Sequence, residues 1–210
     1  MNESQPFIHK LKQRLSQPLP GLDAQMTMSP SLRGRNPVIP ENVRKSAVLV
    51  LVYPQNGSLY VPFMRRAEDG RVHSGQISFP GGKWDDTDTD FIDTALREAN
   101  EEMGIRREEV EVLGQMTELY IPPSNFLVYP TVGFSPRRPD FIPDPKEVAD
   151  IVEVEIAHLA DKNIRGSHRV EVFGGNYITA PGFTVNGDRL IWGATAMMLA
   201  EFLEILNDLK

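Results

Sequence analysis

Residues 80–105 read PGGKWDDTDTDFIDTALREANEEMGI. The segment begins with Pro-Gly-Gly and continues into a stretch whose apolar side chains recur at helical spacing. Intervals of four, three and four residues separate Ile92, Leu96, Ala99 and Met103, which is the spacing of one buried helix face. Asp90 or Thr89 can cap the first turn, and Gly104 is typical of the position just after a helix C-terminus. The pattern predicts a helix over residues 90–104.

The net charge of the chain is concentrated in this stretch. The 210 residues include 22 Lys and Arg and 29 Asp and Glu, which gives a net charge of −7. Residues 85–102 hold eight acidic side chains and one basic side chain, Arg97, so this segment alone carries −7. The remaining residues are balanced, with 21 of each sign. This distribution argues against a general nucleic-acid binder, which needs a basic surface.

Three glutamates of the predicted helix crowd like charge together. Glu98, Glu101 and Glu102 lie at i, i+3 and i+4, so they share one face, away from the apolar stripe. Two interpretations are open: a solvated acidic face, or a site for a hard divalent cation that prefers oxygen ligands. Just upstream, Gly81 and Gly82 predict a tight turn, either an ordinary one or one in which the backbone approaches a ligand.

The rest of the chain is rich in predicted strands. The run SAVLVLVY (46–53) is typical of a strand buried on both faces, and Pro62 in the next strand favours an edge or a bulge. The pattern predicts strands at 46–53, 59–64, 76–79, 109–114, 126–134, 148–156, 169–173, 177–185 and 189–193. A second helix is predicted from residue 194 to 209. We expect an α/β fold with a mixed sheet between helices, an α/β/α sandwich.

The N-terminal residues differ in composition from the rest. Residues 1–40 combine a short amphipathic stretch around Phe7 and Leu11 with a segment rich in Pro and Gly. We therefore expect a helix and an irregular arm over 1–40, packed on one domain over 41–210. The chain has no cysteine and no apolar run long enough to span a membrane, and its first residues lack a signal-peptide core. We expect a cytoplasmic protein without a membrane partner.

The second half of residues 80–105 carries a specific motif. Residues 97–105 read R-E-A-N-E-E-M-G-I, which resembles the second half of the Nudix box at each specified position. The first half departs from that motif. Gly82 is followed by five residues, then by Asp88 in place of the first glutamate, and then by eight residues before Arg97 instead of seven. That first glutamate usually partners the box arginine, so the departure concerns the geometry of the loop.

A second resemblance lies immediately upstream. Arg66-Ala67-x3-Arg71-x3-Gly75-x3-Phe79-Pro80-Gly81-Gly82 is similar to the signature of the coenzyme A diphosphatase branch of Nudix hydrolases. The leucine-leucine-threonine of that branch is replaced by Pro62-Phe63-Met64. The two resemblances together cover residues 62–105.

The resemblance implies a reaction and a set of residues that perform it. The family hydrolyses nucleoside diphosphate derivatives with Mg²⁺ or Mn²⁺, which neutralise diphosphate oxygens and hold a water. Glu98 and Glu102 match the principal metal ligands, and Glu101 matches a third ligand or the group that orients the water. Gly82 matches a carbonyl ligand. Arg97 and Gly104 match structural residues of the box.

The remaining expected site residues contact the substrate or move a proton. Gly81 and Gly82 are expected beside the substrate, and Arg66 and Arg71 beside its phosphates, including the 3′-phosphate of coenzyme A. The alternative for the arginines is surface pairing with the acidic loop. Glu147, between two predicted strands, is the candidate general base, and its alternative is an ordinary exposed loop acid.

The leading hypothesis is a hydrolase that cleaves coenzyme A or acyl-coenzyme A into 3′,5′-ADP and phosphopantetheine or its acyl form. One alternative is the same chemistry on ADP-ribose or a dinucleotide. A second alternative is a non-catalytic Nudix domain that binds a nucleotide. The expected partner is a small-molecule nucleotide, and a homodimer is left open.

Overall fold

The computed structural model describes residues 5–30, 37–68, 75–172 and 174–209. Its helices are α1 (Gln5–Leu15), α2 (Gly21–Met26), α3 (Phe91–Met103), α4 (Ile156–Leu159) and α5 (Gly193–Asn207). The first strands along the chain are β1 (Arg44–Gln55), β2 (Ser58–Arg66), β3 (Ile77–Ser78), β4 (Gly81–Lys83), β5 (Glu111–Gln115) and β6 (Leu119–Ile121). The later strands are β7 (Phe126–Phe134), β8 (Val148–Glu155), β9 (Arg165–Val172), β10 (Asn176–Val185) and β11 (Arg189–Trp192).

Strand β1 is the centre of a mixed sheet, which confirms the predicted fold class. It pairs in parallel with β7 and antiparallel with β2 and β4. In the described part of the chain this sheet has eight strands, with β5 and β6 added beside β7, and β3 and β8 added beside β2. The remaining strands, β9, β10 and β11, form a separate antiparallel sheet.

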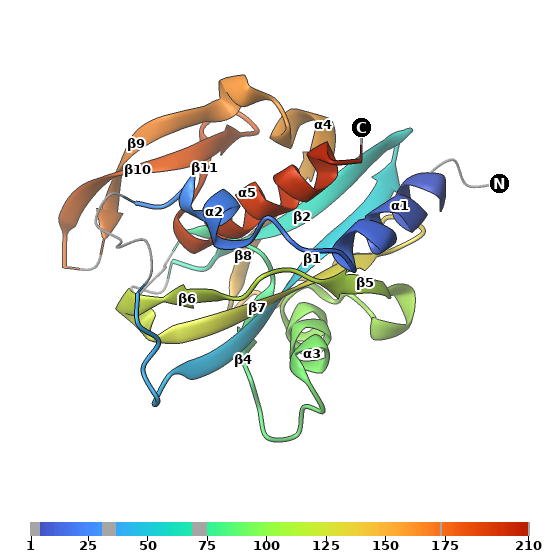
Figure 1. The fold of residues 1–210 in the computed structure, drawn as a ribbon, viewed down its shortest axis with the longest axis horizontal. Coiled ribbons are helices and arrows are strands. Elements are labelled where there is room, and N and C mark those ends of the chain that lie inside the picture. The colour runs from blue at the N-terminus through green and yellow to red at the C-terminus, as the bar shows by residue number, and fades with distance from the viewer. Residues whose placement is uncertain (1–4, 31–36, 69–74, 173, 210) are drawn as a thin grey trace.

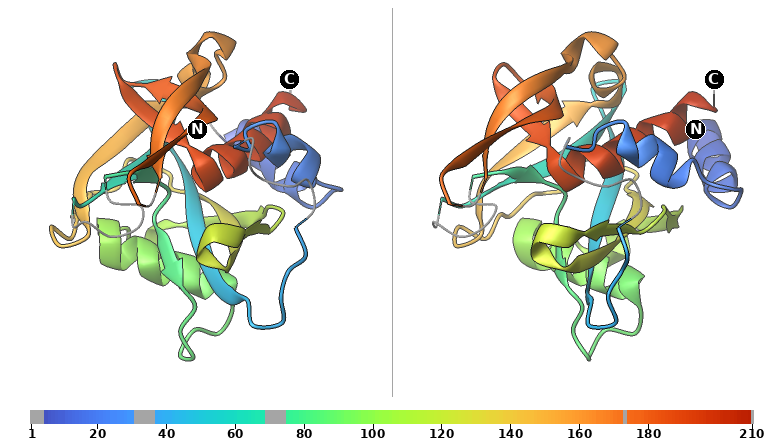
Figure 2. Two further views of the ribbon diagram at one scale, coloured as in Figure 1. Left: turned by 90° about the vertical axis from the view of Figure 1, so that its left-hand side faces the viewer. Right: turned by 60° about the vertical axis from the view of Figure 1, so that its left-hand side comes forward.

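Alternate side chains of β1 enter two different hydrophobic cores. Leu49 and Leu51 pack in the core under α3, whereas Val50 and Val52 pack in the core under α5. Figures 1 and 2 show α3 on one side of the central sheet and α1, α2 and α5 on the other. The α/β/α layering and the double-sided burial of residues 46–53 are thereby confirmed.

The N-terminal segment packs on α5. Helix α1 buries Ile8, Leu11 and Leu15, as its spacing predicts. The expectation of an irregular arm after it is wrong for residues 21–26, which form α2. Helix α5 is apolar nearly all round, and most of its side chains are buried because α1 and α2 cover it. Its one fully buried acid, Glu201, accepts hydrogen bonds from the backbone N–H of Gly21 and the side chain of Gln25.

Three details of the strands differ from the expectation. Gly81 and Gly82 lie in strand β4, paired with β1, and not in a tight turn. Strand β2 is not an edge, because β8 pairs with it along Pro62 and β1 pairs with it near Tyr60. The bulge falls later, between Arg65 and Arg66.

None of the helices in the described residues is long and apolar enough to cross a membrane.

Candidate active site

Helix α3 begins and ends as its sequence predicts. The Asp90 side chain accepts a hydrogen bond from the backbone N–H of Asp93 at 2.8 Å, which caps the first turn. Gly104 ends the helix in the left-handed region with φ +71°, where glycine is favoured. A Cβ on Gly104 would also lie 2.8 Å from the Cβ of Ile142, so a larger residue would displace the loop that covers this end.

Arg97 ties the helix to the acidic loop in front of it. Its guanidinium donates to both carboxylate oxygens of Asp88, at 2.8 and 3.0 Å, and to the carbonyl of Lys83 at 3.1 Å. Thr94 and the backbone N–H of Asp85 also donate to Asp88. Pairing with Arg97 holds the pKa of the Asp88 carboxyl well below its usual range. The loop is one residue longer than in the motif, and the shorter side chain of Asp88 still reaches Arg97.

Glu98 lies between Arg97 and strand β4. Its carboxylate accepts a hydrogen bond from Arg97 at 2.9 Å. A Cβ on Gly82 would stand 2.4 Å from the Glu98 carboxyl carbon, so only glycine leaves room for this carboxylate against the strand. Burial raises the pKa of Glu98, although Arg97 opposes that shift.

Glu102 is the most enclosed of the three glutamates, with 3% of its side chain exposed. The backbone N–H of Gly81 donates to it at 2.7 Å, and Arg66 approaches to 3.7 Å. Burial raises the pKa of Glu102 to about 8, and the charges of Glu98 and Glu147 add to this effect.

The solvated acidic face is therefore a wrong interpretation of the glutamate triplet. Only Glu101 is well exposed, at 58% of its side chain, and it pairs with Arg97 at 3.1 Å. Glu98 has 15% of its side chain exposed and, like Glu102, faces strand β4. The described ion pair of Arg66 is with Glu102 and not with the acidic loop of residues 85–90.

Glu147 lies on the loop between β7 and β8, and that loop is bonded to the end of α3. The backbone N–H groups of Ile142 and Asp144 donate to the carbonyls of Met103 and Glu102, at 2.8 and 3.0 Å. Ala67 donates to the Glu147 carbonyl at 2.8 Å. The exposed Glu147 carboxylate stands near enough to raise the pKa of both Glu98 and Glu102. Sequence reasoning did not identify the anchoring role of Ile142 and Asp144, because it acts through backbone atoms.

The donor set fits a hard divalent cation. Glu98 and Glu102 offer hard oxygen donors beside the glycine backbone of β4, with Glu101 one turn away on the exposed side. Their raised pKa values reflect burial and like charge, both of which a bound cation offsets. Within the described ranges, no three His, Cys, Asp or Glu side chains already converge as a metal cluster. Arg97 pairs with Glu98, and Arg66 and the Gly81 N–H contact Glu102.

Comparison with known families agrees with this geometry. A family model described as the NUDIX domain matches residues 43–170, which include the central strands, α3 and the loop that carries Glu147. The chain belongs to the Nudix hydrolase family. It is thus a pyrophosphohydrolase that acts on a nucleoside diphosphate derivative, in a family that generally uses divalent metal ions.

Curated relatives carry the same family name. Nudix hydrolase NudL of Pectobacterium atrosepticum is 42% identical over 134 residues, covering 63% of this chain and 65% of that protein, just under two thirds of its length. NudL of Photorhabdus laumondii is 35% identical over 175 residues, covering 78% and 86%. Among solved structures, the M. smegmatis Nudix hydrolase RenU aligns with a TM-score of 0.54 at 17% identity, over 87% of this chain and 95% of that one.

The structure gathers most of the predicted site residues in one place. Around the end of β4 and the second half of α3 lie Gly81, Gly82, Arg66, Arg97, Glu98, Glu101 and Glu102. Arg71 lies outside the described residues, so its predicted contact with a phosphate stays a prediction.

Proposed function

We propose that this Nudix hydrolase cleaves the diphosphate of coenzyme A or acyl-coenzyme A, releasing 3′,5′-ADP and phosphopantetheine or its acyl form. The observation that carries the proposal is the continuity between the residues of the coenzyme A signature and the carboxylate site. Arg66, at one end of the signature, stands 3.7 Å from Glu102, and Gly81, at its other end, donates to the same carboxylate at 2.7 Å. The relatives named NudL are consistent with this branch of the family.

Each residue has a proposed task in the reaction. Glu98, Glu101 and Glu102, with the Gly82 carbonyl, hold Mg²⁺ or Mn²⁺, which would neutralise the diphosphate oxygens and lower the pKa of a bound water. Arg66 and Arg71 bind substrate phosphates, and the Gly81 segment lies along the diphosphate. Glu147, the proposed general base, accepts the proton of the attacking water. Arg97 keeps Glu98 and Glu101 in place through its bonds to Asp88.

A substrate panel tests this proposal. The full-length protein is incubated with Mg²⁺ and, separately, coenzyme A, acetyl-coenzyme A, ADP-ribose and NADH, and the products are identified by mass. We expect 3′,5′-ADP from both coenzyme A substrates, no product in EDTA, and a rate at least about 100-fold lower in Glu102→Gln. Turnover of ADP-ribose or NADH alone would support the alternative substrates. No turnover of any compound would support a nucleotide-binding module.

A further inference from the structure

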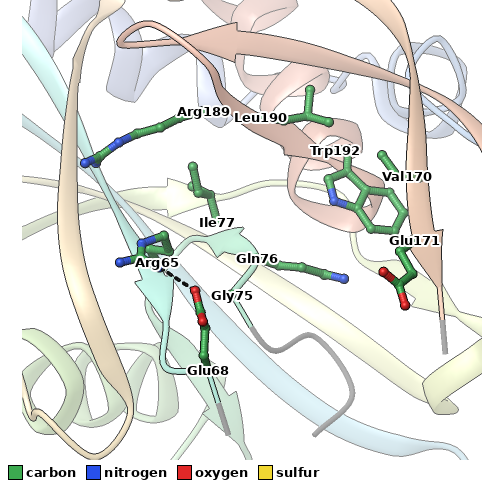
Figure 3. Close-up of a pocket in the computed structure, with 10 residues that line it drawn as sticks. All are labelled: Arg65, Glu68, Gly75, Gln76, Ile77, Val170, Glu171, Arg189, Leu190 and Trp192. Atoms are coloured by element: carbon green, nitrogen blue, oxygen red, sulfur yellow. Dashed lines mark hydrogen bonds and ion pairs between the residues drawn. The ribbon is translucent and has the colours of Figure 1, made fainter. Parts of the chain in front are cut away.

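A cavity of about 570 Å³ lies between the central sheet and the three-stranded sheet (Figure 3). One wall is the end of β2 with the segment from Gly75 to Ile77. The other wall comes from β9 and β11, and β11 packs against β3. Its volume is in the range of sites that hold a nucleotide-sized ligand.

The two ends of the cavity differ in chemistry. Figure 3 shows the indole of Trp192 at one end, with Val170 and Glu171 beside it and Gln76 pointing toward it. The half-buried Trp192 ring and the neighbouring aliphatic side chains offer a flat apolar surface. Glu171 can accept a hydrogen bond from an exocyclic amine, and Gln76 carries both a donor and an acceptor. This end suits an aminopurine base.

The opposite end is cationic. Arg65 and Arg189 line the cavity, and their guanidinium groups lie on the side of Figure 3 opposite to Trp192. Arg65 pairs with Glu68 at 3.2 Å, and Arg189 pairs with Asp150 at 2.6 Å, and about a third of each guanidinium side chain is exposed. Ion pairs of this exposure contribute little to stability, so a phosphate can replace one partner carboxylate at small cost.

The cavity is connected to the proposed reaction centre through the chain itself. Arg65 lines the cavity, and the next residue, Arg66, contacts Glu102. On the other strand, Ile77 lines the cavity, and Gly81, four residues later, donates to Glu102. Four residues of extended chain span at most about 14 Å, so the cavity lies within the length of a nucleotide ester from the carboxylates. Arg65 and Arg66 are successive residues of β2 and lie on opposite faces of the sheet, so such an ester would pass around the end of that strand.

We propose that this cavity binds the adenosine phosphate half of the substrate, with the base stacked on Trp192 and the ribose 3′-phosphate between Arg65 and Arg189. The proposal rests on the proposed function, because its occupant is the nucleotide part of that substrate. It makes β9 and β11 part of the binding surface. Trp192 lies beyond residues 43–170, which the family model matches. Trp192 and Arg189 are then specificity-determining residues that neither resemblance in the sequence includes.

Calorimetric titration of adenosine 3′,5′-bisphosphate into the full-length protein in EDTA tests the cavity without turnover. Trp192→Leu should weaken binding about tenfold or more, because the base loses the aromatic ring on which it stacks, whereas Trp192→Phe should retain most of the affinity. Arg189→Gln should reduce the preference for the bisphosphate over adenosine. The matched control is Arg169→Gln, which removes a cation from β9 that stacks on Tyr177 outside the cavity.

The outcomes separate this proposal from the proposed function. Wild-type affinity in both Trp192→Leu and Arg189→Gln, or an equal loss in Arg169→Gln, would overturn the cavity assignment. In the turnover assay, Trp192→Leu should raise KM for coenzyme A more than it lowers kcat. Coenzyme A hydrolysis with an unchanged KM in Trp192→Leu would overturn the cavity and leave the proposed function standing. Trp192-dependent binding without hydrolysis of any diphosphate would support the cavity and overturn the proposed function.

Discussion

Asp88 shows how a departure from a motif is compensated by its neighbours. Aspartate is one methylene shorter than the glutamate of the Nudix box, and the loop that follows it is one residue longer. The carboxylate still makes a two-bond contact with Arg97 and accepts two further hydrogen bonds, from Thr94 and Asp85. The box arginine therefore keeps a carboxylate partner. That partner lies one residue further from the arginine in the sequence than the glutamate of the motif does.

The Asp88–Arg97 pair gives a pH-dependent stability that can be measured. The pKa of Asp88 is lowered in the folded chain, so its contribution to the free energy of unfolding is fully present above its unfolded value of about 3.9. That contribution is lost as the pH falls through the lower folded value. Asp88→Asn should therefore lower the free energy of unfolding at pH 7 by about 2 kcal/mol or more.

Urea unfolding of wild type and Asp88→Asn at pH 7 and at pH 3 checks this prediction. The difference between the two proteins should shrink at pH 3, because the unfolded wild-type chain takes up a proton on Asp88 there, whereas the folded chain keeps Asp88 ionised. Asp86→Asn on the same loop, whose acid is exposed, is the control and should change little at either pH. A difference that stays the same at both pH values would contradict the assigned role of Asp88.

At the scale of the element, α3 and the central strands were predictable from local patterns. The 4, 3, 4 spacing, the Asp90 cap and Gly104 act within one helix, so the sequence alone predicts its bounds nearly to the residue. Strand β4 was not predictable, because Gly81 and Gly82 have the composition of a turn and become a strand through pairing with Ala47 and Val48. The burial of Glu102 also depends on this pairing, since β4 supplies its N–H donor.

We predict that position 82 requires glycine, because β4 approaches the Glu98 side chain of α3 closely there. In Gly82→Ala, the new Cβ would overlap the Glu98 carboxylate and displace it, which should lower kcat/KM for the hydrolysed substrate about tenfold or more. Gly166→Ala is the matched control, because its φ is also compatible with alanine and its Cβ would meet only the flexible tip of His168. Similar kinetics in Gly82→Ala and wild type would show that Glu98 does not act from this position.

The loop that carries Glu147 gives a prediction about proton transfer. Backbone bonds from Ile142, Asp144 and Ala67 hold this loop, so Glu147→Gln should keep its fold. Loss of a general base should lower kcat about 100-fold or more with a smaller change in KM. Asp140→Asn, an exposed acid on the same loop, is the control and should retain wild-type kcat. Equal kcat in Glu147→Gln and wild type would assign the base to another group.

At the scale of the whole molecule, the N-terminal segment is part of the core. The buried carboxylate of Glu201 accepts bonds from Gly21, Gln25 and Thr117, and α1 places Ile8, Leu11 and Leu15 in the larger hydrophobic core. The first 40 residues, which differ in composition from the rest, therefore include segments that pack against the domain that follows them. Local composition indicates that the segment packs on the domain but not which residues it contacts, because these contacts join residues about 180 positions apart.

Removal of residues 1–30 should destabilise the protein by about 3–5 kcal/mol or more, because it removes the buried side chains of Ile8, Leu11 and Leu15 and exposes the apolar face of α5 to water. Thermal unfolding of the full and truncated chains measures this effect. A truncated chain as stable as the full chain would show that the segment contributes nothing to the core.

The most direct test of the central claim is a competition between substrates at the one carboxylate site. Equal concentrations of coenzyme A and ADP-ribose are mixed with the full-length protein and Mg²⁺, and the formation of 3′,5′-ADP and AMP is followed by mass in the same samples. The account predicts that 3′,5′-ADP forms at least about ten times faster, a difference of about 1.4 kcal/mol in transition-state binding. Faster formation of AMP, or formation of neither nucleotide, would contradict it.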